Sequence, residues 1–216
     1  PLEPDTVSPA EWANKPVTWA MEPGSTTKLM SIAAVLNEGK LKPRSRISVP
    51  PSLFRGGQTF KDSHEHGGLQ LTLAGVLAES SNIGTVLAAD KIGGKKLYEY
   101  LKRFGVGEPT GLDFPGEQTG YVPHPDEWSD TTFPTLAFGQ GMSLTALQIA
   151  NATATIGNDG VPVQPRLIDS YQAPDGTIEK TAPVEGEPVV TPETAATMQD
   201  MMQMVVGEGG TAKVAE

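Results

Sequence analysis

The sequence predicts a helix-rich α/β (α+β) domain. Apolar residues recur at helical spacing in several segments, each with a capping residue before it or a helix-ending residue after it. Extended patterns are fewer and shorter. The chain of 216 residues contains no Pro- or Ser-rich linker, and it is long enough to bury one core. We therefore expect a single domain over residues 1–216.

The predicted helices are identified by the residues at their ends. The first runs from about Ser25 to Glu38, because Pro23 and Gly24 stop any earlier helix and Gly39 follows it. The last helix is predicted from a capping threonine, Thr191, followed by a proline, Pro192, at the first helical position. The remaining helices are expected at residues 72–79, 82–92, 95–104 and 145–156, and the last from residues 191–193 to about Val206.

The extended segments are short. Residues 161–171 alternate loosely between apolar and polar side chains, which is typical of extended backbone. Two further pieces of sheet are expected around residues 47–49 and at residues 189–190. An interrupted sheet exposes unpaired backbone groups, so we expect another segment to complete it.

The composition excludes some partners. Lysine and arginine number 16 against 26 aspartate and glutamate residues, a formal net charge of −10, and this argues against nucleic acid and anionic lipid. The chain has no cysteine, which suits an oxidising space outside the cytoplasm. No stretch approaches the roughly 20 apolar residues of a membrane span. The sequence also has no signal peptide, so a membrane anchor would have to lie in sequence beyond this chain.

A serine and a lysine are spaced for nucleophilic catalysis at the start of the first predicted helix. Ser25 and Lys28 lie three apart, so they share a helix face and can come within hydrogen-bond reach. A lysine held neutral can then act as the base for the serine hydroxyl, with the positive end of the helix dipole beneath both. The alternative interpretation of the same spacing is a capping serine beside a solvated lysine. Roughly one Ser-x-x-Lys is expected by chance in a chain of this length, so the spacing alone does not decide between the two.

A second polar motif favours the catalytic reading. Ser80-Ser81-Asn82 interrupts two apolar helical patterns and is expected to form a short turn between them. Small polar side chains on such a turn can point into a cleft. Ser-x-x-Lys followed by a Ser-x-Asn triplet and Lys-Thr-Gly is the signature of penicillin-binding proteins and class A β-lactamases.

The order and spacing of further motifs give a family resemblance over nearly the whole chain. The chain resembles the transpeptidase domain of a class B penicillin-binding protein of the septal, division-specific type. The resemblance implies the helix-rich part of a transpeptidase or serine β-lactamase-like fold, with the central antiparallel sheet incomplete in this chain. The motifs are residues 22–28 (EPGSTTK), 62–67 (DSHEHG), 80–84 (SSNIG), 104–112 (FGVGEPTGL), 120–123 (GYVP), 138–141 (FGQG), 145–148 (TALQ) and 158–160 (NDG).

The resemblance also implies roles for the catalytic residues. Ser25 is the nucleophile, Lys28 the base, Ser80 a proton relay to the leaving amine, and Asn82 a hydrogen-bond donor to the substrate backbone. One oxyanion donor is the backbone N–H of Ser25. Residues expected to contact substrate or line the cleft are Thr27, Ser81, Gly139 and Gln140.

The sequence departs from the family pattern in one motif. Lys-Thr-Gly is absent, since the only Lys-Thr is Lys180-Thr181 and Ala182 follows it. We therefore expect a partial domain that lacks the Lys-Thr-Gly strand, the N-terminal anchor and the pedestal module. By itself such a fragment is expected to be inactive, because the missing strand supplies a second cation and the other oxyanion donor.

The activity that the resemblance implies is peptidoglycan D,D-transpeptidation during cell division. Its partners are a D-Ala-D-Ala donor stem, an amine acceptor, β-lactams as inhibitors, and membrane proteins of the division machinery including a glycosyltransferase. It implies a bacterial membrane protein facing outside the cytoplasm, anchored by an N-terminal helix absent from this chain, and no cofactor. Two alternatives stay open, a D,D-carboxypeptidase or β-lactamase on the same scaffold and a non-catalytic β-lactam-binding or sensor protein.

Two other constellations are interpreted as structural. His64 and His66 form His-x-His, but no third ligand lies at a suggestive spacing, so no metal site is expected. Glu108 precedes Pro109 as a deacylating glutamate would, yet its flanking glycines favour a turn residue over a hydrolytic base.

Overall fold

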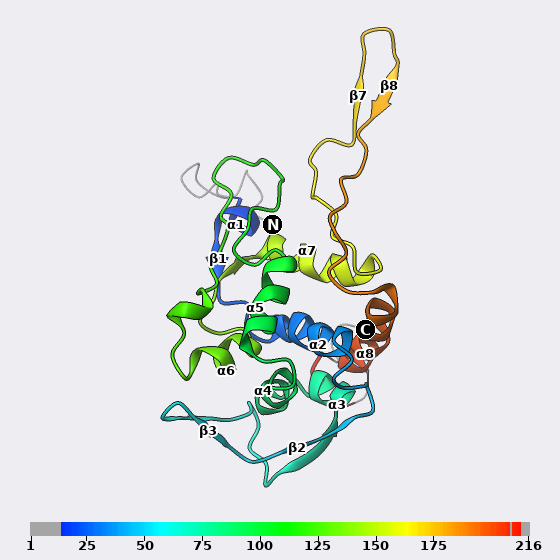
Figure 1. Cartoon of the computed structure of the whole chain (residues 1–216). Coiled ribbons are helices and arrows are strands. Elements are labelled where there is room, and N and C mark those ends of the chain that lie inside the picture. Colours follow the sequence, from blue (N-terminus) through cyan, green and yellow to red (C-terminus); the bar gives the residue numbers. More distant parts are fainter. Residues whose placement is uncertain (1–13, 208, 213–216) are drawn as a thin grey trace, which may run out of the picture.

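The computed structural model describes residues 14–207 and 209–212. Figure 1 shows a body of helices around a central helix, α2, with short strands along one end and a long hairpin projecting from the other. The helices are α1 (Lys15–Thr18), α2 (Lys28–Asn37), α3 (Leu73–Ala78), α4 (Asn82–Ala89), α5 (Gly94–Arg103), α6 (Thr132–Ala137), α7 (Ala146–Gly157) and α8 (Pro192–Val206), with 3₁₀ turns η3 (Gly24–Thr27) and η4 (Pro125–Glu127).

The strands of the described residues pair in four separate antiparallel ladders of two strands each. In the β2–β5 ladder Ile47 lies opposite Leu71 and Val49 opposite Leu69, so one face of the ladder turns apolar side chains toward the helices. The pairs are β1 (Ala20–Met21) with β6 (Leu144–Thr145), β2 (Arg46–Val49) with β5 (Leu69–Thr72), β3 (Leu53–Arg55) with β4 (Gln58–Phe60), and β7 (Ser170–Gln172) with β8 (Ile178–Lys180).

Helix starts follow the capping residues. The hydroxyl of Thr72 accepts from Gly75 N–H at 3.0 Å at the start of α3, and Thr191 caps α8 in the same way. Thr145 and Gln148 form a capping box at the start of α7, with each side chain bonded to the backbone of the other residue. The helices predicted at residues 72–79, 95–104, 145–156 and 192–206 are confirmed to within one or two residues, and the one at 82–92 ends three residues early.

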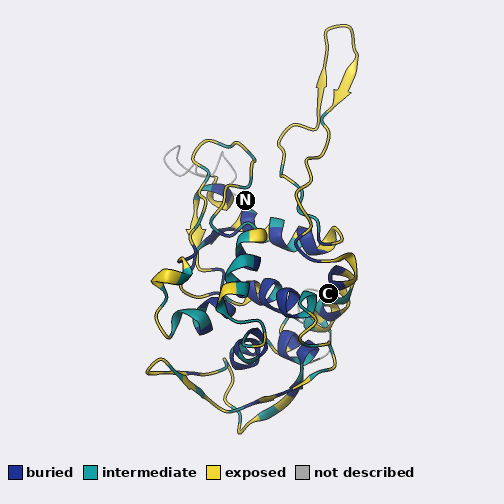
Figure 2. Cartoon of the chain, in the orientation of Figure 1, coloured by how far each residue is buried: buried dark blue, intermediate teal, exposed yellow. Residues whose placement is uncertain are grey.

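The hydrophobic core surrounds α2. Ile32, Ala33, Ala34 and Val35 are fully buried, and α3, α4, α5 and α8 all contact this helix. Figure 2 shows α2 buried along its length, whereas the β7–β8 hairpin is exposed throughout. A helix buried on every side must be apolar all round, except where a polar side chain has an internal partner. Lys28, at the first position of α2, is such an exception.

Several expectations about extended segments need correction. Val189 and Val190 form no strand; they are buried in a bend before α8, where they pack into the core. Residues 161–169 are irregular apart from a single bridge at Val163, and the regular strand begins only at Ser170. The hairpin of β7 and β8, the ladders β1–β6 and β3–β4, and helices α1 and α6 were not predicted. The helix-rich mixed class is confirmed. Among the described residues no helix has the length and apolar character needed to cross a membrane.

Candidate active site

The predicted nucleophile lies on a 3₁₀ turn and not at the cap of an α-helix. Ser25 is exposed within η3, and the α-helix begins three residues later at Lys28. Gly24, with a φ of 56°, precedes Ser25, and its N–H donates to the carbonyl of Gly139 at 3.0 Å. The expectation that Ser25 opens the α-helix is therefore corrected, but the three-residue spacing still places Ser25 and Lys28 on one side of the chain.

Lys28 is buried and directs its amine at two serines. Its side chain is among the largest fully buried ones in the described residues, at 1% exposure. Nζ donates to Ser25 Oγ at 3.1 Å, to Ser80 Oγ at 2.9 Å and to the carbonyl oxygen of Ser80 at 2.5 Å. Burial lowers the Lys28 pKa from 10.5 to about 8, and the negative charge of Asp62 opposes that shift. At pH 7 about one tenth of the amine is thus neutral and can accept a proton, and this fraction rises with pH.

Ser80 reaches Lys28 because its backbone is left-handed. It connects α3 to α4 with a φ of 54°, one of three non-glycine residues with positive φ in the part of the chain that the structure describes. This conformation costs about 1 kcal/mol or more, and surrounding contacts must maintain it. It turns both the hydroxyl and the carbonyl of Ser80 toward Nζ. The 2.9 Å separation lies within the roughly 3.5 Å expected for a proton relay.

The two residues after Ser80 differ in burial, and neither lines the hollow that contains Ser25. Asn82 is half-buried, and its amide donates to the carbonyl of Lys61 at 3.1 Å. Ser81 is 3% exposed; its hydroxyl donates to Asp62 and accepts the N–H of Gly84 as the cap of α4. The expected contact of Ser81 with substrate is therefore corrected, because its hydroxyl is occupied inside the protein.

The three other residues expected to line the cleft, Thr27, Gly139 and Gln140, do not line the hollow that contains Ser25. Thr27 is fully buried, so it does not face a substrate. Gly139 is also buried and packs so closely on the η3 turn that a Cβ there would overlap the carbonyl of Gly24. Its role is to allow that close approach. Gln140 is exposed beside this contact. Neither Gly139 nor Gln140 lines the hollow that contains Ser25.

A hollow of about 300 Å³ opens in front of Ser25 and Lys28. Its lining combines the three catalytic candidates with apolar residues, most of which come from α8. Sequence reasoning missed this apolar part of the lining, although the apolar residues near the end of α8 were a usable signal. The lining residues are Ser25, Thr26, Lys28, Leu29, Leu77, Ser80, Met202, Val205, Val206 and Thr211.

Neither of the two remaining constellations lines the hollow that contains Ser25. Glu108 is exposed and forms an ion pair with Lys102, and it does not line the hollow with Ser25. His66 contacts Asp62 at 3.1 Å. Among residues 14–207 and 209–212, no group of three or more His, Cys, Asp or Glu side chains is arranged to hold a metal ion.

Comparisons with known proteins give consistent matches over most of the chain. Residues 3–216 match the family model described as the penicillin binding protein transpeptidase domain. Penicillin-binding protein PbpB of Mycolicibacterium smegmatis is 41% identical over 91% of this chain and 30% of its own length. Peptidoglycan D,D-transpeptidase FtsI of Escherichia coli is 34% identical over 91% of this chain and 31% of its own. The chain thus spans about 30% of the length of these curated relatives.

A solved structure of similar fold also contains a β-lactam. The crystal structure of penicillin-binding protein 3 from Mycobacterium tuberculosis complexed with aztreonam superposes with a TM-score of 0.88 at 38% identity. The match covers 94% of this chain and 47% of the other. The two chains are therefore similar in amino-acid sequence as well as in fold.

Proposed function

Because the chain belongs to the penicillin-binding protein transpeptidase family, we propose that it carries the acylation site of a peptidoglycan D,D-transpeptidase that acts in cell division. The observation that carries the proposal is the position of Lys28 Nζ, 3.1 Å from Ser25 Oγ and 2.9 Å from Ser80 Oγ. A buried amine between two hydroxyls can take a proton from one and pass a proton through the other. The relative FtsI of Escherichia coli, named a D,D-transpeptidase, supports the same activity.

The proposed reaction has two steps. Ser25 Oγ attacks the carbonyl of the penultimate D-Ala of a D-Ala-D-Ala stem, and neutral Lys28 accepts the hydroxyl proton. Ser80 relays a proton to the departing D-Ala amine as the C–N bond breaks, which leaves an ester on Ser25. The amine of a neighbouring stem then attacks this ester, gives up a proton through the same relay, and forms the cross-linking amide while Ser25 is released. A β-lactam would acylate Ser25 and stay attached, because its amine remains tethered to the acyl group.

Two groups are proposed to position the substrate. The amide of Asn82 has a second N–H besides the one directed at Lys61, and this one can donate to the substrate backbone. The backbone N–H of Ser25 is one oxyanion donor, and the other would come from a Lys-Thr-Gly strand. The apolar side of the hollow, formed by Met202 and its neighbours, would accommodate the non-polar part of the donor stem.

A hydrolase or a non-catalytic binding protein has less support. Hydrolysis requires a carboxylate base that activates water near the acylated serine, and the hollow is lined by no acidic residue among those described. The candidate base, Glu108, is paired with Lys102 elsewhere. A protein that binds its ligand without a covalent bond would need no base beside the serine, whereas Lys28 Nζ lies 3.1 Å from Ser25 Oγ.

We extend the proposal to the cellular setting by analogy with the relatives. The protein would be anchored in the bacterial membrane, with this domain outside the cytoplasm, and would work with membrane proteins of the division machinery, including a glycosyltransferase. Support comes from the names of the relatives alone.

The first test is to label the nucleophile. Residues 1–216, extended by a Lys-Thr-Gly segment, are incubated with a fluorescent penicillin, and we expect one label that peptide mass maps to Ser25. Ser25→Ala should abolish it, whereas the control Ser52→Ala, at an exposed loop position, should not. Residues 1–216 alone should react about 10²- to 10³-fold more slowly, as one oxyanion donor is missing. A label that maps to Ser80 or Ser81 would contradict the assignment.

A further inference from the structure

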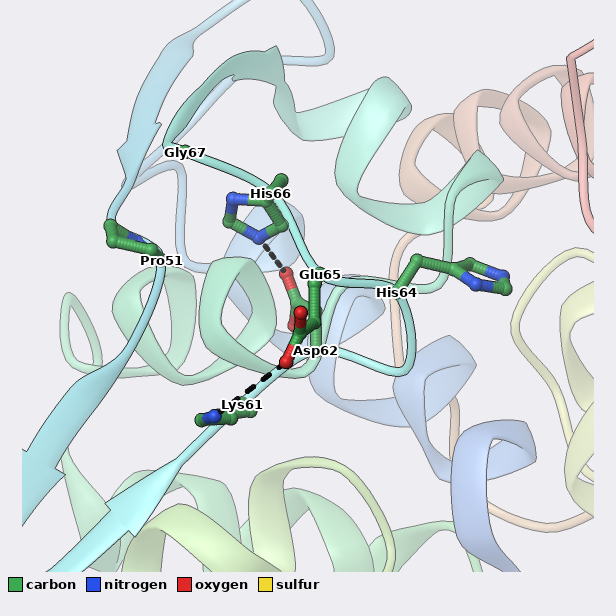
Figure 3. A pocket seen from close by; sticks show the side chains of 7 residues that line it. All are labelled: Pro51, Lys61, Asp62, His64, Glu65, His66 and Gly67. Carbon is green, nitrogen blue, oxygen red and sulfur yellow. Dashed lines mark hydrogen bonds and ion pairs between the residues drawn. The ribbon is translucent and has the colours of Figure 1, made fainter.

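A buried carboxylate accepts hydrogen bonds from the residues that follow Ser80. Asp62 belongs to the loop between β4 and β5, and its side chain is 8% exposed. Its oxygens accept three hydrogen bonds, from Ser81 Oγ at 2.8 Å, from the N–H of Ile83 at 2.9 Å and from His66 at 3.1 Å. Figure 3 shows His66 directed at this carboxylate from the same loop. Each oxygen is therefore occupied, and the carboxylate is held in one orientation.

These contacts tie the loop to the residues that follow Ser80. Asp62 binds the side chain of Ser81 and the backbone of Ile83, and the adjacent carbonyl of Lys61 accepts from the side chain of Asn82. Hydrogen bonds thus connect residues 81–83, which include the start of α4, to residues 61 and 62 of the loop. The bonds to a buried carboxylate are charge-assisted and so stronger than neutral ones.

His66 is oriented to donate to Asp62 while it is neutral. Its Nδ1 accepts the N–H of Gly68 at 3.1 Å, so the ring proton of the neutral form lies on Nε2, the atom that faces Asp62. Both ring nitrogens are satisfied within the loop. The loop is therefore preorganised to present a charged Asp62 to the turn.

Asp62 also acts on the base through its charge. It is the one charged group that opposes the effect of burial on Lys28 and thereby raises the lysine pKa. The other charged or titratable side chains around Asp62 are those lining the outer hollow, namely Lys61, His64, Glu65 and His66. Of these, Lys61 and Glu65 are mostly exposed and 3.9 Å apart. Asp62 therefore forms hydrogen bonds to the turn and also acts electrostatically on Lys28.

We propose that Asp62 is a positioning residue for the acylation site, which holds the Ser80–Ser81–Asn82 turn in the left-handed geometry that places Ser80 on Lys28. The inference rests on the proposed function, because it concerns the same serine and lysine. Asp62 does not line the hollow that contains Ser25, so it would act through the turn and not on the substrate. Its hydrogen bonds to Ser81 and Ile83 supply the contacts that keep Ser80 in a costly backbone conformation.

The test is the pH profile of acylation in Asp62→Asn, measured with a fluorescent penicillin on the Lys-Thr-Gly-extended protein. Asparagine is nearly isosteric but uncharged, and it cannot accept all three hydrogen bonds. We expect the plateau rate at high pH to fall on the order of 10- to 100-fold, since small displacements of reacting groups cost that much. The midpoint of the rise, near pH 8 in the parent protein, should move to lower pH because the charge that raises the Lys28 pKa is gone. The amount labelled at saturation shows how much protein is folded.

Two further variants separate the contact from the charge. Ser81→Ala breaks the bond to Asp62 but keeps the carboxylate, so the plateau should fall while the midpoint stays. Glu65→Gln removes an exposed carboxylate from the same loop and should change neither. If Asp62→Asn has the same plateau rate and the same midpoint pH as the parent protein, the inference is overturned, but the proposed function is not affected. If Asp62→Asn does not fold, Ser81→Ala decides, and a parent plateau there would overturn the positioning role. Labelling that survives Ser25→Ala would instead refute the proposed function.

Discussion

Replacing Lys28 by methionine should make the protein's stability less dependent on pH. Lys28 is buried, and its pKa in the folded protein is about 8 against 10.5 for an ordinary lysine. Below pH 8 it is protonated in both the folded and the unfolded states, and the folded state bears the cost of a buried charge. Between pH 8 and 10.5 the folded state releases this proton while the unfolded state keeps it. The unfolded state then binds more protons, so stability rises with pH in that window.

The magnitude follows from the two pKa values. At pH 7 the buried charge costs the folded state about 3.4 kcal/mol, and at pH 9.5 about 1.4 kcal/mol of that cost remains. The parent protein should therefore gain about 2 kcal/mol relative to Lys28→Met between pH 7 and pH 9.5. At pH 7 the methionine variant should be the more stable one, by about 1 kcal/mol once the lost hydrogen bonds to Ser25 and Ser80 are offset. It should also be inert to penicillin.

Urea unfolding at the two pH values measures this difference. Other titrating groups are common to both proteins, so their contributions cancel. The control is Lys91→Met, because Lys91 is exposed just after α4 and its loss should change stability by less than about 0.5 kcal/mol at either pH. A stability difference between Lys28→Met and the parent that does not change from pH 7 to pH 9.5 would refute the lowered pKa, and with it the neutral base.

Two further predictions concern the buried, closely packed positions Gly139 and Gln148. Gly139→Ala should slow acylation at least about tenfold and lower stability, because its Cβ would overlap the carbonyl of Gly24 next to Ser25. Gly105→Ala has the same φ but no atom within 4 Å, so it should cost only about 1 kcal/mol with no change in acylation, and equal effects would contradict the packing argument. Gln148→Ala should lower the free energy of unfolding by about 2–4 kcal/mol, because the buried amide donates to three carbonyls, those of Gly105, Glu108 and Thr119. Gln203→Ala on the exposed face of α8 is its control in the same urea titration, and a similar loss there would show that the carbonyl contacts contribute little.

Local chemistry explains why the helices and the serine–lysine pair could be predicted from sequence. Thr72, Thr145 and Thr191 cap their helices through bonds to residues three positions away, so the signals lie within a few residues of the structure they produce. The three-residue spacing of Ser25 and Lys28 survives even though the turn is a 3₁₀ helix, because i and i+3 are neighbours in both helix types. The expected strand at Val189 and Val190 failed for the complementary reason. Strands need a partner, and an apolar pair fits a buried bend equally well.

The sequence by itself determined where α3, α4, α5, α7 and α8 begin to within one residue, which serine and lysine share a turn, and which family the chain resembles. Tertiary structure alone decided that Ser80, 52 positions from Lys28, turns its hydroxyl onto the lysine amine. It also decided that Ser81 bonds to Asp62 and faces the interior, and that Lys28 is buried enough for its pKa to fall. The physical reason is that capping and spacing act through neighbours along the chain. Burial, charge and backbone strain instead depend on residues brought together only when distant segments pack around α2.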